Sequence, residues 1–238
     1  EIREKNNFKL QIDEEYLVIV LGGPAMLIGL GGGAASSVSS GDSEEDLDFA
    51  SVQRDNAEME RRCQEVINKC SNQENSYIEF IHDVGAGGLS NAIPELAKDS
   101  ELGVYIELSK IPTADKSMSP MEIWSNESQE RYVLAIHKDN QNAFEEICHR
   151  ERCEFAIVGV TTKEKTVKLY DEDNNNFPVN VPLSMLFGDL PIKEIRATSN
   201  YLYKTDDDNA EELDLESSII MISVSYTHLT LPTTYGVL

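Results

Sequence analysis

The chain has 238 residues, of which 40% are hydrophobic and 26% charged, an ordinary composition for a globular protein. Its formal net charge of −23 argues against a nucleic-acid partner, because counterion release requires a clustered basic surface. No apolar run approaches the length of a membrane-spanning helix, so we expect no membrane partner. An anionic ligand would need metal ions or backbone N–H groups around it to offset this acidic surface.

The first residues of the chain and its cysteines indicate what kind of protein and compartment the chain comes from. The sequence opens at Glu1 without a methionine or a basic, apolar leader, so we expect it to begin inside a larger protein. Four cysteines could form two disulfides or a metal site, but the spacing of Cys63 and Cys70 fits one helix face better than a chelating pair. We therefore predict reduced, partly buried thiols at all four positions and a cytoplasmic location.

The first predicted element is a buried strand at residues 16–21, a short apolar run closed by a Gly-Gly-Pro turn. Glycine and small residues dominate residues 29–41, and an acidic loop follows. From Asn56, apolar residues recur at three- and four-residue steps, which predicts an amphipathic helix. Asp55 and Glu58 stand where a capping box would begin that helix.

A second strand is predicted at residues 78–82, followed by Asp83 and a glycine turn. We expect Ser90 to cap the next helix, with Pro94 in its first turn, where a missing N–H removes no helical hydrogen bond. Further strands are predicted at residues 104–108, 132–137, 155–161 and 166–170, with a helix at residues 141–152. Because strands and helices interleave, we predict a layered α/β domain.

The amino-acid composition of the chain changes after residue 191. Residues 206–209, Asp-Asp-Asp-Asn, have the composition of a solvated linker. Residues 224–234 resemble the conceptual translation of a transposon-based sequencing adapter, although their β-branched residues alone would predict a strand. We therefore exclude residues 223–238 from the fold prediction and expect the natural chain to continue differently past Ile222.

The glycine-rich residues 29–34 are a candidate nucleotide site. No Gly-x-x-x-x-Gly-Lys-Ser/Thr sequence occurs, which excludes a P-loop. Residues 29–34 match a loose dinucleotide-binding pattern after a strand, but the acidic residue expected about twenty positions later, at the end of a second strand, is missing. This segment is either a loop whose N–H groups could approach an anion or a purely structural turn.

The segment from His82 to Ser90 is a more specific pattern for ligand binding than residues 29–34. A carboxylate, Asp83, ends a strand and is followed by three glycines, Gly85, Gly87 and Gly88, and then by a helix. This order places a hard oxygen ligand beside closely approachable backbone, which suits Mg²⁺ bridging to a phosphate. The alternative is a tight structural turn with Asp83 as a turn or cap residue.

A cluster of polar side chains at residues 126–131 precedes an apolar strand. Such a cluster can bind a polar ligand, but a solvated loop is the commoner origin of a polar run. The residues alone favour the loop.

Blocks of distinctive sequence recur in order across residues 16–191. They are residues 22–26, 29–37, 46–56, 58–67, 82–91, 119–124 and 126–133. Together these blocks closely resemble the family of large, multidomain phosphoribosylformylglycinamidine synthases. The number and order of the blocks make chance agreement negligible.

The resemblance implies a domain organisation. The synthetase region of that family consists of two related halves, each with an N-terminal and a C-terminal domain similar to those of aminoimidazole ribonucleotide synthetase. Residues 16–195 resemble the C-terminal domain of the first half, a mixed sheet with packed helices. Residues 1–15 would then connect from the preceding domain, and residues 196–222 would lead toward the second half.

The resemblance also implies site residues. It assigns contacts with formylglycinamide ribonucleotide to Gln53, Glu127, Ser128 and Gln129, and it makes Asp83 a Mg²⁺ ligand beside the phosphate-approach glycines. One departure is Arg54-Asp55-Asn56, which stands where smaller relatives have Gly-Asp-Pro, so the loop around Gln53 can differ in shape.

The family reaction converts an amide to an amidine, using ATP and ammonia from glutamine. The implied cofactors are Mg²⁺ and ATP, and the implied partners are the ribonucleotide, the other synthetase half and the glutaminase domain. None of the four cysteines lies in a nucleophile elbow, so ammonia production is not assigned to this fragment. No catalytic residue is assigned in it, and we expect the fragment to be inactive without its neighbouring domains. A largely structural, nucleotide-holding half of the same enzyme is the alternative.

Overall fold

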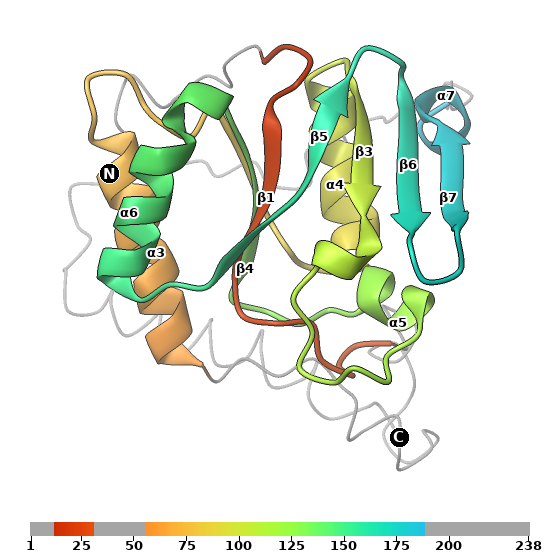
Figure 1. Cartoon of the computed structure of the whole chain (residues 1–238), viewed down its shortest axis with the longest axis horizontal. Coiled ribbons are helices and arrows are strands. Elements are labelled where there is room, and N and C mark those ends of the chain that lie inside the picture. The colour runs from red at the N-terminus through yellow and green to blue at the C-terminus, as the bar shows by residue number, and fades with distance from the viewer. Residues whose placement is uncertain (1–11, 31–55, 189–238) are drawn as a thin grey trace, which may run out of the picture. The chain divides into compact units, whose positions relative to one another are not determined.

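The computed structural model describes residues 12–30 and 56–188 (Figure 1). Gln53, the linker after residue 195 and the adapter-like tail, all singled out by the sequence, lie outside these residues. In the described part, strands and helices alternate along the chain, and the strands form a seven-stranded mixed sheet. The predicted layered α/β architecture with a mixed sheet is therefore confirmed.

The sheet has the strand order β2-β4-β1-β5-β3-β6-β7. The bounds of its strands are β1 Leu17–Gly22, β2 Phe80–Asp83, β3 Gly103–Glu107, β4 Arg131–Ile136, β5 Phe155–Thr162, β6 Thr166–Asp171 and β7 Asn176–Pro182. All neighbouring pairs are antiparallel except β3 and β6, which are parallel. The first of the described strands, β1, therefore lies inside the sheet, between β4 and β5.

Strand β1 shows why the central strands read as continuous apolar runs. Val18 and Val20 belong to the hydrophobic cluster on one face of the sheet, whereas Ile19 and Leu21 belong to the cluster on the other face. Successive side chains of a strand point to opposite faces, so a strand covered on both faces must be apolar at every position. Strand β4 repeats this arrangement, with Val133 and Leu134 in different clusters.

Helices cover both faces of the sheet. Helix α4 (Leu89–Asp99) packs in the first cluster, while α3 (Ala57–Ser71) and α6 (Gln141–Glu151) lie side by side in the second (Figure 1). Short helices α5 (Pro120–Ser125) and α7 (Leu183–Leu186) and the 3-10 turns η2 (Leu108–Lys110) and η3 (Lys138–Asn140) complete the described elements. None of the described helices could span a membrane, being too short or too polar.

Two helix starts differ from the sequence predictions. Helix α3 is capped by Asn56, whose side chain accepts a hydrogen bond from the backbone N–H of Met59 at 3.0 Å, so the expected capping box at Asp55 and Glu58 is wrong. Helix α4 begins at Leu89 after Gly88 and not after Ser90. Pro94 therefore falls in the second turn, where it removes a helical hydrogen bond to the Ser90 carbonyl.

The cysteines follow the prediction of reduced thiols. All four are free and buried, and Cys63 and Cys70 do share the buried face of α3. The Sγ atoms of Cys63 and Cys153 lie 3.7 Å apart, which joins α3 to the turn before β5. Burial raises the pKa of the Cys70 thiol to about 12, so this group is protonated and inert at neutral pH.

Candidate functional site

Three strand ends meet at one edge of the sheet and position the candidate site. Strand β1 ends at Gly22, which pairs with Arg131 at the start of β4, and β2 ends at Asp83, which pairs with Tyr132. Because both neighbours run antiparallel to β4, the loop after β1, the turn after β2 and the loop before β4 all emerge together. The topology thus gathers segments that are far apart in the sequence.

The glycine turn after β2 has a conformation that requires glycine. Gly87 and Gly88 have φ values of +77° and +61°, and a Cβ on Gly88 would lie 2.0 Å from the carbonyl oxygen of Asn126. The N–H of Gly88 donates to the Gly85 carbonyl at 3.0 Å, which closes the turn. The absence of side chains lets this turn pack directly against the loop before β4.

Glu127 faces into the protein. Only 5% of the residue's surface is exposed. Its Oε1 atom accepts a hydrogen bond of 2.8 Å from the backbone N–H of Gly87. Its own N–H donates to the Ile28 carbonyl at 2.9 Å. The carboxylate predicted to contact substrate therefore occupies one of the glycine-turn donors, and a phosphate binding that N–H would have to displace it.

Ser128 and Gln129 differ in their accessibility. Ser128 is buried, and its Oγ atom accepts from the N–H of Met26 at 2.9 Å, so its hydroxyl ties down the loop after β1. Gln129 is partly exposed and lines a cavity, with its Nε2 atom donating to the Glu127 carbonyl at 3.0 Å. Of the three predicted substrate contacts in this segment, the Gln129 side chain is the one that reaches the cavity.

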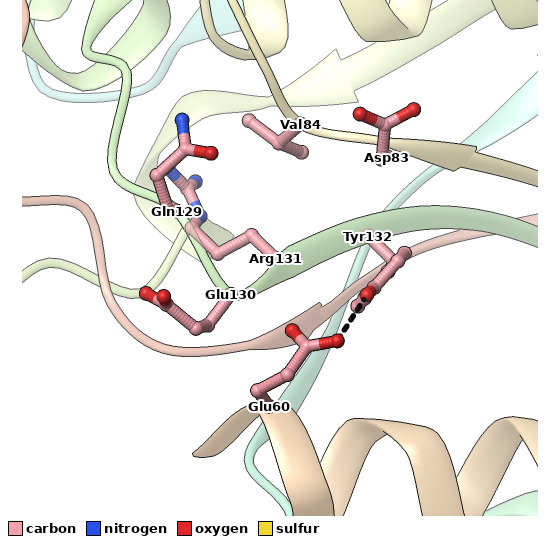
Figure 2. Close-up of a pocket in the computed structure, with 7 residues that line it drawn as sticks. All are labelled: Glu60, Asp83, Val84, Gln129, Glu130, Arg131 and Tyr132. Atoms are coloured by element: carbon pink, nitrogen blue, oxygen red, sulfur yellow. Dashed lines mark hydrogen bonds between the residues drawn. The ribbon is translucent and has the colours of Figure 1, made fainter. Parts of the chain in front are cut away.

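The cavity has a volume of about 320 Å³ and lies between the strand ends and α3 (Figure 2). It is lined by Glu60, Asp83, Val84, Gln129, Glu130, Arg131 and Tyr132. Glu60 extends from α3 toward Tyr132, whose hydroxyl donates to the Glu60 carboxylate at 2.9 Å. Burial and this hydrogen bond raise the pKa of the Tyr132 hydroxyl, so Tyr132 is neutral at physiological pH.

Arg131 is the one cation among the residues that line this cavity, and it is almost completely buried, with 1% of its surface exposed. Its Nη1 atom donates to Asn126 Oδ1 at 3.1 Å, while Nε and Nη2 have no hydrogen-bond acceptor in the described structure. Burial lowers the pKa of the guanidinium to about 10, which still leaves it charged at neutral pH.

Asp83 is the residue that the family resemblance makes a Mg²⁺ ligand. Its side chain is 79% exposed at the end of β2 and borders the cavity. Within residues 12–30 and 56–188, no three His, Cys, Asp or Glu side chains are grouped closely enough to hold a metal ion. One exposed carboxylate does fit Mg²⁺, because this ion commonly takes one or two protein carboxylates and completes its shell with water and substrate phosphates.

Sequence reasoning missed part of this site. It did not single out Glu60 or Tyr132, which reach the cavity from α3 and β4, because only the fold brings these segments together. Arg131 stood in the polar cluster before β4, but a charged residue at a strand start gives no sign of being buried.

The fold and the sequence define the class of protein. Residues 14–172 match the family described as AIR synthase related protein, C-terminal domain, and the chain belongs to this family. Among solved structures, it is similar to PurL of Thermotoga maritima complexed with FGAR, with 23% identity and a TM-score of 0.66 over 81% of this chain and 31% of that chain.

Two further structures from T. maritima show the same fold. One is phosphoribosylformylglycinamidine synthase II, with 20% identity and a TM-score of 0.65 over 81% of this chain and 29% of that one. The other is PurL complexed with ATP, with 19% identity and a TM-score of 0.61 over 84% and 30%. This chain spans about a third of the length of the structures that it matches.

Proposed function

We propose that this chain forms part of the synthetase active site of a phosphoribosylformylglycinamidine synthase, an ATP-dependent carbon–nitrogen ligase with glutamine as the amide donor. The reaction would convert formylglycinamide ribonucleotide, ATP, glutamine and water to formylglycinamidine ribonucleotide, ADP, phosphate and glutamate. Membership of the family and the fold shared with PurL support this proposal. The solved T. maritima PurL structures include complexes with FGAR and with ATP.

The observation that carries the proposal is the meeting of Asp83 and Gln129 at one cavity, with the glycine turn directly after Val84, which also lines it. Phosphoryl chemistry depends on positioning and on offsetting negative charge, and exposed carboxylate, backbone and neutral amide groups serve those ends together. Asp83 would hold Mg²⁺, which when bound offsets phosphate charge. The Gln129 amide would hydrogen-bond the ribonucleotide, and we assign the same task to Gln53, which lies outside the described residues.

Glu127 and Ser128 receive a narrower role in this proposal. Their side chains are engaged with Gly87 and Met26, so they would present the backbone of their segment to substrate and hold the neighbouring loops. The glutaminase domain and the second synthetase half would be supplied by the rest of the enzyme, because no group in this chain is assigned to ammonia production.

A structural, nucleotide-holding module is the second candidate function. The observation that favours its structural part is the Glu127 carboxylate on the Gly87 N–H, since this donor is engaged within the protein and is not open to a substrate phosphate. In such a module the cavity residues would have little effect on turnover.

Substitution of Gln129 in the full-length enzyme separates the two candidates. We expect Gln129→Ala to raise the KM for formylglycinamide ribonucleotide about three- to tenfold, because this factor corresponds to the usual free-energy contribution of one neutral hydrogen bond. The matched control is Gln141→Ala, because Gln141 begins α6 beyond the opposite end of β4 and donates to Glu145. Equal kinetics for Gln129→Ala, Gln141→Ala and wild type would favour the structural module.

A further inference from the structure

The segment Asn126–Ser128, here called the clamp, connects the two loops that emerge from β1 and β2. On one side, Ser128 Oγ accepts from the Met26 N–H at 2.9 Å and the Glu127 N–H donates to the Ile28 carbonyl at 2.9 Å. On the other side, Glu127 Oε1 accepts from the Gly87 N–H at 2.8 Å. The clamp therefore sets how the glycine turn lies relative to the loop after β1.

The Asn126 side chain holds the clamp in shape. Its Oδ1 atom accepts from Arg131 Nη1 at 3.1 Å, from Ser128 Oγ at 2.7 Å and from the Ser128 N–H at 3.3 Å. Its Nδ2 atom donates to the carbonyls of Glu122 and Ile123 at 2.7 and 2.8 Å, at the end of α5. Because Oδ1 faces the donors and Nδ2 faces the carbonyls, the network determines a single orientation of the amide.

The stability of the fold does not explain why an arginine is buried at position 131, next to the Asn126 amide. A buried charge is costly unless it is fully paired, and Arg131 has two buried nitrogens without an acceptor in the described part of the chain. Replacing an incompletely paired buried ion by an apolar residue of similar size is often neutral or stabilising. The guanidinium does donate a directed hydrogen bond to Asn126 Oδ1. Through Asn126, this bond holds the clamp in one conformation.

We propose that Arg131 and Asn126 are positioning residues for the ribonucleotide site. Arg131 acts through Asn126: it orients the amide, the amide fixes the clamp, and the clamp sets the glycine turn and the Gln129 side chain that follows it. The proposal rests on the proposed function, since it takes the cavity to be the place where a phosphate-bearing substrate binds.

A comparison of binding with folding stability tests the proposal in the full-length enzyme. We expect Arg131→Met to melt at the same temperature as wild type or higher, while the KM for formylglycinamide ribonucleotide rises about tenfold and glutaminase activity persists. Arg131→Lys keeps the charge but loses the planar fork, so it should recover only part of the loss. Arg150→Met is the matched control, because Arg150 is an exposed arginine paired with Glu151. An unchanged KM in Arg131→Met would overturn the proposal.

A double-mutant cycle keeps the test decisive if Arg131→Met is itself destabilised. If Arg131 acts through Asn126, the KM of Arg131→Met/Asn126→Ala should equal that of Asn126→Ala alone, because the second change removes nothing further. Losses that multiply would show two independent contributions and would overturn the proposed relay.

Hydrogen exchange separates failure of this inference from failure of the proposed function. If the wild-type enzyme makes no amidine, the proposed function fails, but the clamp can still be measured at the Gly87 N–H, which Glu127 holds. We expect Arg131→Met to speed exchange at Gly87 severalfold, with exchange in β1 unchanged. Unchanged exchange at Gly87 would overturn the positioning role whatever the activity.

Discussion

Asp83 and Glu127 are two carboxylates that border the same glycine turn, yet they face opposite ways. The Asp83 side chain is 79% exposed at the end of β2, whereas Glu127 is 5% exposed and is bound to the Gly87 N–H. The resemblance to the synthase family implies ligand binding for both. The structure separates an exposed carboxylate from one that is buried and engaged with the protein backbone.

The difference arises from the packing around each residue. Asp83 ends β2, an edge strand of the sheet, and borders the open cavity. Glu127 lies between two glycine-containing loops, and a Cβ on Gly29 would come within 2.4 Å of the Glu127 Cβ atom. Residues without side chains on both sides create the space that the Glu127 side chain fills.

The largest expected effect comes from Gly88→Ala, which would break the contact between the turn and the clamp. The new Cβ would meet the Asn126 carbonyl at 2.0 Å, and the φ of +61° with ψ of −143° is a conformation that is essentially restricted to glycine. We expect the free energy of unfolding to fall by about 3 kcal/mol or more. Chemical denaturation of the full-length enzyme, monitored by a signal from this domain, would measure this loss of free energy.

The control for that prediction is Gly85→Ala in the same turn. A Cβ on Gly85 would approach only Asp83 Oδ2, at 3.7 Å, an ordinary contact. We expect a loss below about 1 kcal/mol. Equal losses in both variants would show that the close approach of Gly88 to the clamp has no energetic importance.

An intermediate effect is expected for Glu127→Ala, which leaves the Gly87 N–H without its acceptor. An unsatisfied buried donor costs about 1–3 kcal/mol, so the melting temperature should fall and the turn should loosen. Glu127→Gln retains an oxygen at the same place and should lose less than about 1 kcal/mol. If Gln and Ala are equally damaging, the charge of Glu127 matters more than its hydrogen bond, and its inward role needs revision.

The smallest effect on stability is expected for Asp83→Asn. The side chain is exposed, so the free energy of unfolding should change by no more than about 0.5 kcal/mol. Activity should nonetheless show a raised Mg²⁺ requirement, with the rate partly recovered at high metal, because a hard cation loses the attraction of the charge. Mg²⁺ titrations of the two enzymes would measure this, and superimposable curves would assign Asp83 to the turn alone.

The sequence predicted the core of the fold better than its margins. Strand β1 was predictable because burial on both faces makes every position apolar, and α3 because its apolar residues recur on one face. Strand β7 was missed, since its residues are largely exposed and include Pro178 and two asparagines. Helix α5 was also missed, although Ser119 and Glu122 form a capping box that the sequence displays.

The candidate site was predictable only in part, for a similar physical reason. Asp83 and the glycines stood out because a carboxylate and three glycines after a strand are an uncommon local pattern. The inward turn of Glu127 and the burial of Arg131 depend on loops that are distant in sequence, so no local pattern reports them. The roles of Gln53 and of the tail remain predictions, because those residues lie outside the described part of the chain.

The place of β1 in the sheet has a consequence for how the protein is made. Residues at the β1 end of the chain bond with partners far downstream, as in the hydrogen bond from the Tyr16 N–H to Thr161 Oγ1, 145 residues away. At ribosomal rates of about 5–20 residues per second, β1 waits on the order of ten seconds for β5, its second neighbour. During most of that interval neither of its neighbouring strands has been made and its apolar faces are uncovered, so nascent chains of this domain should depend on chaperones and fold slowly once released.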